Sequence, residues 1–494
     1  MKVAKEYAKE ENGWIRRRDI REFIKMVFTS YQYLLIFFPL TVLFFYLIRG
    51  KRSALYTIIL ASCIFYYTWG GVKYLSLLGF SLFFNYFITK YGINKYEKKW
   101  ILTLGVITNV CLLGYFKYTN FFVDKFSQLF GLSIHISQII LPLAISFYTF
   151  QQIAWLIDNY KKEAPECDFI EYASAVLFFP HLIAGPIVQY HDLVPQLKVI
   201  KSEINYKLVL NGIFLIAVGC VKKIYLADYI ASYVDVWYTD FSHLNTIKAW
   251  LATVGYVFQI YFDFSGYCDI AIGSALILGI KLPQNFNDPY KAESIRDFWR
   301  RWHITLGYFL TKYVYIPLGG NRKGKRRTLI NIFLMLCISG LWHGAGIHFI
   351  LWGALHGLAM VIHRIYSESH AFKLPRLASI IITFITVSLF WVAFRSDNVH
   401  CMSTVFKNLF CLNIPHGVNS EIKSSFDLHQ LRPYLYMIIL SFIIVYLLPK
   451  AQEIYDKYSK KKAILFAVFS AGAIWLSLAK TMTNSYTTFI YFNF

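Results

Sequence analysis

The chain has 494 residues, of which 57% are hydrophobic and only 16% are charged, whereas an ordinary soluble domain carries about 25% charged residues. Lys and Arg outnumber Asp and Glu by 50 to 28. The apolar residues come in blocks close to the roughly 20 that cross a bilayer, so the composition excludes a soluble enzyme and a basic nucleic-acid-binding domain. We interpret the surplus of positive charge as cytoplasmic loops of a membrane protein.

Residues 1–27 form a charged arm that lacks the apolar core of a signal peptide. We expect this arm to be cytoplasmic or interfacial. The rest of the chain, 28–494, is expected to be a single transmembrane domain, because no segment is long enough for a separate soluble domain of about 100 residues.

Apolar runs that could cross a membrane recur along the whole chain. Each span must satisfy its own backbone hydrogen bonds, so the predicted fold class is an all-α polytopic membrane protein. Several runs are short, and we therefore expect roughly 10 to 13 true spans, with the others re-entrant or interfacial. The runs are 31–48, 54–70, 74–88, 101–116, 136–157, 173–187, 208–226, 249–264, 270–280, 328–341, 347–365, 380–394, 435–448 and 464–478.

Basic loops predict which ends of the spans are cytoplasmic. The strongest are 49–52, 90–99, 321–327 and 457–462. The polar stretch 395–432 mixes Asp, His, Asn and Ser and is expected to face outward. It contains Cys401 and Cys411, and whether these pair stays open, because a disulfide requires an oxidising compartment.

The region 285–321 interrupts the hydropathy pattern. Ser294 or Glu293 is placed to cap a helix that runs through "IRDFWRRWHITLGYFL", in which aromatic residues alternate with Arg300, Arg301 and other charged residues. Such an amphipathic helix lies in the membrane interface or lines a wet cavity.

The segment "GGNRKGKR" matches seven places of a phosphate-binding P-loop. The eighth place is Arg326 in place of the hydroxyl that binds magnesium, and no strand precedes it, so a nucleotide-hydrolysing loop is excluded. Arg322, Lys323 and Lys325 suit an anionic ligand. The alternative is a plain positive-inside loop.

His343 lies in "SGLWHGAGIHF", between two apolar runs. One interpretation is a structural histidine bonded to a neighbouring helix. A metal site is disfavoured, because His348 is five residues away on another helix face, and His356 and His363 share a face without a third ligand. The third interpretation is acid–base chemistry, since histidine can take a proton from a hydroxyl near neutral pH.

Two acidic residues also fall in an apolar setting. Asp263 and Asp269, in "YFDFSGYCDIAIG", are candidate buried polar groups, since an ionisable residue within a span usually faces a partner or a cavity. We expect Arg300 or Arg301 to be their partners.

Three long motifs occur in order: "QIYFDFSGYCDIAIGSALILGIKLPQNFNDPY", "IRDFWRRWHITLGYFLTKYVYIPLGGNRKGKRR" and "SGLWHGAGIHFILWGALHG". Together with "FFPHLIAGPIVQ" and the closing "FIYFNF", they resemble the membrane-bound O-acyltransferase family, specifically its bacterial alginate O-acetyltransferase-like branch. The resemblance runs from about residue 28 to the end and places the motif core at 259–363.

The resemblance implies a site and a mechanism. It identifies His343 as the catalytic histidine and His303 as a second motif histidine, in a helical body with a central tunnel. It implies acetyl-CoA or another acyl thioester as donor and no metal or bound cofactor. Our own inference adds Arg300, Arg301, Arg322, Lys323 and Lys325 as residues that guide an anionic donor.

The resemblance also implies a setting: the cytoplasmic membrane of a bacterium, membrane lipid around the protein, a polysaccharide or cell-wall glycan as acceptor, and an extracytoplasmic partner of the acetyltransferase or esterase type. Two alternatives stay open. One is D-alanyl transfer to teichoic acid. The other is a transporter or flippase without covalent chemistry, for which the His303 and His343 motifs have no evident use.

Overall fold

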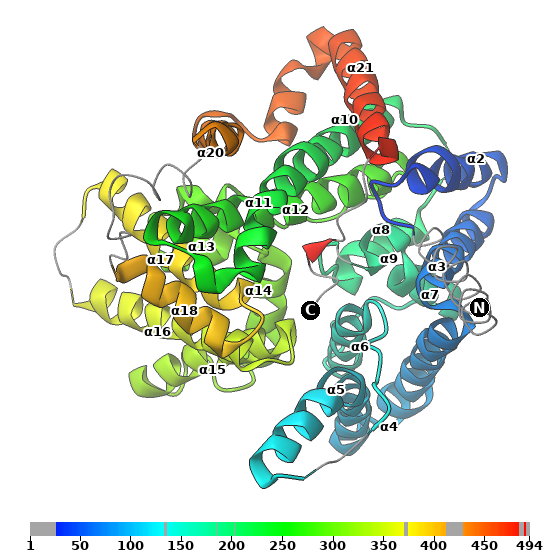
Figure 1. Cartoon of the computed structure of the whole chain (residues 1–494). Helices are drawn as coiled ribbons and strands as arrows, with labels where there is room; N and C mark the ends of the chain where they lie inside the picture. The colour runs from blue at the N-terminus through cyan, green and yellow to red at the C-terminus, as the bar shows by residue number, and fades with distance from the viewer. Residues whose placement is uncertain are drawn as a thin grey trace, which may run out of the picture.

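A computed structural model describes residues 26–132, 136–183, 185–201, 203–369, 374–411, 428–483 and 489–490. Within this part the chain is a set of helices, and an isolated bridge joins Phe286 and Trp302. Residues 1–25 of the expected arm 1–27 lie outside the described residues. Figure 1 shows the amino-terminal helices on one side, α15–α18 on the other, and α10 and α12 between them.

The amino-terminal third contains long helices followed by short ones. Gly71 has a φ of 62° and non-helical backbone that breaks α3 at a kink, so the expected spans 54–70 and 74–88 lie in the two helical segments on either side of it. The elements are η1 (Gln32–Phe37), α2 (Phe38–Leu47), α3 (Lys51–Phe87), η2 (Ile88–Ile93), α4 (Asn94–Tyr96), α5 (Lys99–Phe130), α6 (Ile145–Tyr160), α7 (Phe169–Leu177), α8 (Phe179–Leu182) and α9 (Tyr190–Lys198).

Two tightly crossing helices, α10 and α12, form the centre. A Cβ added to Gly212 would lie 2.5 Å from the Gly273 carbonyl oxygen, and one added to Gly219 would lie 2.5 Å from that of Gly266. Small residues thus allow the two backbones to touch, as they do between membrane helices. The elements here are α10 (Tyr206–Cys220), η3 (Val221–Ala227), α11 (Asp228–Thr239), η4 (Phe241–His243) and α12 (Thr246–Ile277).

The interrupted region is not the single helix expected from the sequence. Ser294 does cap its start, accepting from the Asp297 N–H at 3.2 Å, but the helix ends at Arg301 and a second one begins at Ile304. The break arises because the segment 285–287 pairs with it: the Asn285 carbonyl accepts from the Ile304 N–H. The elements are η5 (Pro289–Lys291), α13 (Ile295–Arg301), α14 (Ile304–Leu310) and η6 (Thr311–Tyr315).

The carboxy-terminal helices complete the body. A Cβ on Gly340 would lie 2.2 Å from the Phe349 carbonyl oxygen, so α15 and α16 also cross closely. The helix Leu431–Leu447 is bent by 58° against Ala451–Ser459, which sets the α20–α21 arm at an angle. The elements are α15 (Lys325–His343), α16 (Ile347–Glu368), α17 (Arg376–Arg395), α18 (Val399–Phe410), α20 (Leu428–Leu447) and α21 (Ala451–Thr483).

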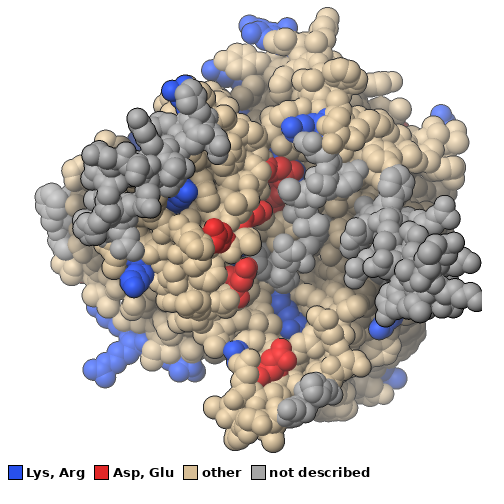
Figure 2. Space-filling view, in the orientation of Figure 1, with Lys and Arg blue, Asp and Glu red and all other residues tan. Residues whose placement is uncertain are grey.

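Among the described residues, six helices are long and apolar enough to cross a membrane, or seven if the bent pair is one span. This is fewer than the roughly 10 to 13 predicted from span length. Expected spans 249–264 and 270–280 are both parts of α12, while the apolar runs around α6 and α7 form helices of only 16 and 9 residues. Most of the face in Figure 2 carries neither acidic nor basic groups, as an all-α polytopic membrane protein requires.

Candidate active site

His343 is the last residue of α15, and its side chain is inside the protein. The residue is 3% exposed. Its ring lies 4.9 Å from that of Trp342, 5.1 Å from that of Trp352 and 5.2 Å from that of Phe394, measured between centroids. Gly344 ends the helix in an extended conformation, where a Cβ would strike the Phe349 ring. The small residues after His343 therefore let α16 close over the histidine.

Helix α5 caps the end of α15 that carries His343. The Lys117 Nζ donates to the carbonyl oxygens of Trp342 and His343, and it also bonds Ser146 Oγ at 3.2 Å. The next residue, Tyr118, donates its hydroxyl to the Leu341 carbonyl at 2.6 Å. The last carbonyls of a helix have no partner within it, so these two side chains satisfy three of them.

His303 occupies the break between α13 and α14, with a left-handed φ of 46° and no exposed surface. Its Nδ1 lies 3.1 Å from the Asn285 side chain. The same Asn285 oxygen accepts from the Thr305 N–H and from the Thr305 hydroxyl, so it is an acceptor. His303 Nδ1 must therefore carry the proton in the neutral ring, which leaves the lone pair on Nε2.

The two motif histidines meet around one tryptophan. Although they are forty residues apart in the sequence, the Trp342 ring lies 6.4 Å from that of His303 and 4.9 Å from that of His343. A third histidine follows: Trp352 lies 4.9 Å from the His356 ring, and the Trp299 indole N–H donates to His356 Nδ1 at 3.3 Å. The sequence indicated His356 only as part of an incomplete metal site. Within the described residues, no group of three or more His, Cys, Asp or Glu side chains could hold a metal ion.

Asp263 and Asp269 have lysines as partners, contrary to the expectation of arginines. Asp269 pairs with Lys222 at 2.6 Å, and Asp263 pairs with Lys223 at 2.5 Å. Both lysines belong to η3, which crosses α12 at the level of the aspartates. The pattern "CVKKIYL" inside the 208–226 run could have identified them, because two adjacent lysines within a span require partners.

The two arginines expected to meet those aspartates lie elsewhere. Arg301 turns back to Asp297 at 2.9 Å and reaches the Asn287 carbonyl at 3.4 Å. Arg300 instead lines a cavity of about 350 Å³ between the α13–η6 segment and helices α15 and α16. This cavity is cationic, because Arg296 and Arg364 also line it, although the Arg364 guanidinium is paired with Glu368; His363 is a further lining residue.

The basic loop lies beside the same cavity. Asn321 lines it, while Arg322, Lys323 and Lys325 are exposed. Lys325 approaches Glu368 at 3.6 Å. The structure thus brings one predicted donor-binding residue, Arg300, into a cavity and leaves the three loop cations on the surface. The sequence did not identify Arg296, His363 and Arg364 as donor-binding candidates. Arg296 could have been found, because its i,i+4 spacing from Arg300 puts two arginines on one helix face.

Cys401 and Cys411 are not joined. Cys401 is buried, Cys411 is exposed, and both are free thiols.

A multi-pass helical body that buries two histidines around one tryptophan has the features of a membrane enzyme. Residues 163–397 match the sequence profile of the membrane-bound O-acyltransferase family. The chain belongs to this family and is an O-acyltransferase, as the resemblance implied.

The chain is also similar to particular members of this family. The chain is 37% identical to the peptidoglycan O-acetyltransferase of Helicobacter pylori, over 96% of its own length and 98% of that protein. It is 38% identical to a probable alginate O-acetylase of Pseudomonas aeruginosa, over 78% of this chain and 75% of the relative. The chain is 30% identical to a teichoic acid D-alanyltransferase of Bacillus subtilis, over 46% of this chain and 60% of that protein. The predictions of an enzyme, an all-α fold and a multi-pass protein of the bacterial inner membrane are confirmed.

Proposed function

We propose that this enzyme passes an acetyl group from a cytoplasmic thioester to a hydroxyl of an extracytoplasmic cell-envelope glycan, with His343 as general base. The observation that carries the proposal is the burial of His303 and His343 around Trp342. Full-length similarity to a peptidoglycan O-acetyltransferase supports acetyl as the acyl group and a glycan as the acceptor. The same family similarity favours an enzyme over a transporter.

His343 has the chemistry of the proton acceptor. A neutral ring nitrogen takes the proton of the acceptor hydroxyl as its oxygen attacks the thioester carbonyl carbon. The carbon–sulfur bond then breaks, and the thiolate leaves and takes a proton from the imidazolium, which restores the neutral ring. The attacking hydroxyl belongs either to the glycan or to a carrier residue that holds the acyl group first.

We propose that His303 is a positioning residue. With its proton fixed on Nδ1 by Asn285, the neutral ring presents Nε2 as an acceptor. It therefore orients a hydroxyl or His343, and it polarises the thioester carbonyl only when it is protonated.

The cationic cavity suits the donor. Arg296, Arg300 and Arg364 line one space of about 350 Å³, and guanidinium groups bind phosphates through two parallel hydrogen bonds. We assign the phosphates of acetyl-CoA to this cavity. From there the proposed course of the thioester to His343 passes Trp299 and His356, which are joined by a hydrogen bond.

Completion of the transfer by an extracytoplasmic partner is part of the proposal. The described residues bury His303 and His343 inside the protein, whereas the proposed acceptor glycan lies outside the cell membrane. A separate protein of the acetyltransferase or esterase type would carry the group from the membrane to the glycan.

The test is a measurement of base-releasable esters on envelope glycans. Peptidoglycan and soluble polysaccharide are purified separately from cells with and without the gene, and both acetate and D-alanine are quantified after mild alkali. The proposal expects acetate, in one glycan fraction, only when the gene is present. Gene-dependent D-alanine without acetate would favour the D-alanyl transfer alternative, which similarity to the teichoic acid enzyme keeps as the second candidate.

A further inference from the structure

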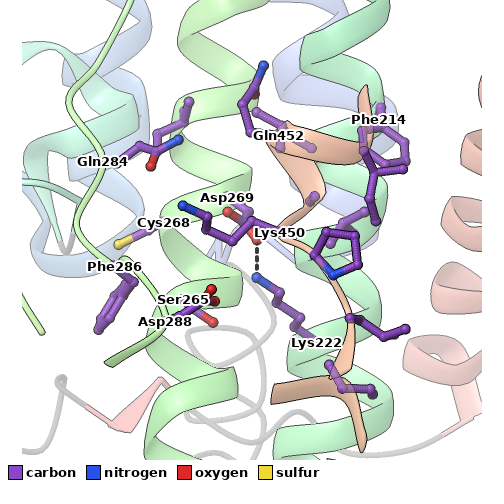
Figure 3. Close-up of a pocket in the computed structure, with 18 of the residues that line it drawn as sticks. Phe214, Lys222, Ser265, Cys268, Asp269, Gln284, Phe286, Asp288, Lys450 and Gln452 are labelled. Carbon is purple, nitrogen blue, oxygen red and sulfur yellow. Dashed lines mark hydrogen bonds and ion pairs between the residues drawn. The ribbon is translucent and has the colours of Figure 1, made fainter. Parts of the chain in front are cut away.

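A larger cavity, of about 580 Å³, shares no lining residue with the arginine cavity. It is enclosed by α10 and α12 on one side and by the bent α20–α21 arm on the other (Figure 3). Its walls are mainly aromatic and aliphatic. The acyl-transfer chemistry described above makes no use of it. The apolar lining includes Phe214, Val218, Ile444, Leu465, Phe466 and Phe469.

The floor of this cavity carries a balanced pair of charges. Lys222 and Asp269 point toward each other and are 2.6 Å apart, as Figure 3 shows. Their side chains are 20% and 19% exposed, so both reach the cavity. Asp288, which also lines it, is paired with Lys291 at 3.1 Å. Because each acid has a cationic partner, the interior is neutral and suits an apolar ligand.

The rim of the cavity carries two lysines. Lys450 lines it, where it donates to Asn287 at 2.8 Å and is paired with Glu453 at 2.8 Å. Lys462 lines it too, lying 5.5 Å from the centre of the Tyr458 ring. It ends the basic run 457–462, which the positive-inside rule places at the cytoplasmic interface. A cavity with an apolar interior and lysines at one membrane interface is complementary to a lipid chain with an anionic headgroup.

The cavity also touches the support of His303. Asn285 and Phe286 form part of its wall. Asn285 holds the His303 ring, and Phe286 packs against Trp302 with 5.0 Å between ring centroids. A molecule that fills the cavity therefore packs against the turn that orients the second motif histidine.

We propose that this cavity binds one acyl chain of an anionic glycerophospholipid, with the headgroup phosphate on Lys450 and Lys462. The bound lipid fills the space between the α20–α21 arm and the protein body and supports the 284–288 turn. The site is separate from acyl transfer, so the inference does not depend on the identity of the donor or the acceptor.

The test is lipid binding to the purified full-length chain in detergent, followed by native mass spectrometry. Phosphatidylglycerol and neutral phosphatidylcholine of the same chain length are titrated in parallel. We expect one tightly held phosphatidylglycerol per chain, with at least about 5-fold weaker binding of phosphatidylcholine. Lys450→Gln and Lys462→Gln should each weaken phosphatidylglycerol binding about 5-fold, since one lysine near a membrane phosphate contributes about 1 kcal/mol.

Matched variants separate this cavity from general membrane charge. Lys95→Gln is the control, because Lys95 is also exposed and lies 5.3 Å from the ring of its neighbour Tyr96, but does not line the cavity. It should leave binding unchanged. Val218→Trp fills the interior and Leu448→Trp fills the rim, so each should abolish the tight lipid.

Three results would overturn the inference. The first is equal binding of both lipids, and the second is a loss of phosphatidylglycerol binding in Lys95→Gln as large as in the two cavity lysine variants. The third is displacement of the lipid by acetyl-CoA, which would make the cavity part of the donor path. If the tryptophan variants do not fold and so fail to elute as a single species from size-exclusion chromatography, the Lys450→Gln and Lys462→Gln variants still test whether the cavity binds the anionic lipid.

Discussion

The Lys117 ammonium, on α5, donates a hydrogen bond of 3.3 Å to the backbone carbonyl of His343, at the end of α15. A residue 226 positions away thus fixes the backbone of the proposed catalytic histidine. The lysine is 8% exposed and also bonds the Trp342 carbonyl. Helix α5 therefore acts as the external cap of the helix that presents His343.

We predict that Lys117→Met lowers acyl transfer about 10- to 100-fold, because a displacement of about 1 Å at the reacting group has this effect. The buried carbonyls left without a donor should also destabilise the fold by about 1–3 kcal/mol. Activity in membranes and thermal unfolding in detergent measure the two effects. Tyr118→Phe is the matched control: it removes the one bond to Leu341 and should cost about 1 kcal/mol with little loss of activity. Native activity in Lys117→Met would contradict the positioning role.

The Asn285 amide supports a second prediction, because its oxygen serves both His303 and Thr305. Asn285→Leu removes that acceptor and should lower kcat about 10- to 100-fold. Asn285→Asp keeps an acceptor at the same place and should recover most of the activity. The comparison is made at equal protein level in the membrane. If the leucine and aspartate variants were equally inactive, orientation of His303 by this oxygen would be ruled out.

The arginine cavity predicts an effect on donor affinity. Arg300→Gln and Arg364→Gln should each raise the KM for acetyl-CoA about 10-fold or more with little change in kcat, because a hydrogen bond to a charged group contributes about 1.5–3 kcal/mol. The native KM should also rise with salt concentration. Arg376→Gln is the control, since Arg376 makes only an exposed ion pair with Glu293. Unchanged KM values in both cavity variants would place the donor elsewhere.

The buried Asp263 side chain binds the backbone of Ile490, the last described residue. Its carboxylate pairs with Lys223 and accepts from the Ile490 N–H at 3.0 Å, while Phe489 stacks on Tyr267 with 4.4 Å between ring centroids. We predict that Asp263→Asn destabilises the protein by about 1–3 kcal/mol, because Lys223 keeps its pair with Asp228 at 2.7 Å. Loss of the charged acceptor should also speed hydrogen exchange at the Ile490 amide. Asp269→Asn breaks the neighbouring pair with Lys222 and should leave the Ile490 amide protected. Equal exchange in the two variants would contradict this anchor.

Much of the architecture was predictable because the membrane restricts the possibilities to apolar helices. His343 was also predictable, since its motif is local. The break at His303 was not, because its left-handed φ is imposed by pairing with Asn285, eighteen residues earlier. Lys117 was missed for a related reason: the expected span ended at residue 116, whereas α5 continues to Phe130.

The partners of buried charges were equally hard to predict. Asp263 and Asp269 were recognised as intramembrane acids, yet their lysines lie on η3, and only the crossing of α10 and α12 brings the two elements together. That crossing depends on Gly212, Gly219, Gly266 and Gly273, which a pattern of hydropathy does not distinguish from other small residues.

The most direct test of the account is base-releasable acetate on the envelope glycans of cells that carry the native chain, His343→Ala or His243→Ala at equal membrane levels. His243 is the control because its side chain is 80% exposed, beside Asp240. We predict that acetate in the His343→Ala cells falls to the level of cells without the gene, while His243→Ala cells keep the native level. Native acetate in the His343→Ala cells would contradict the central claim that His343 is the catalytic base.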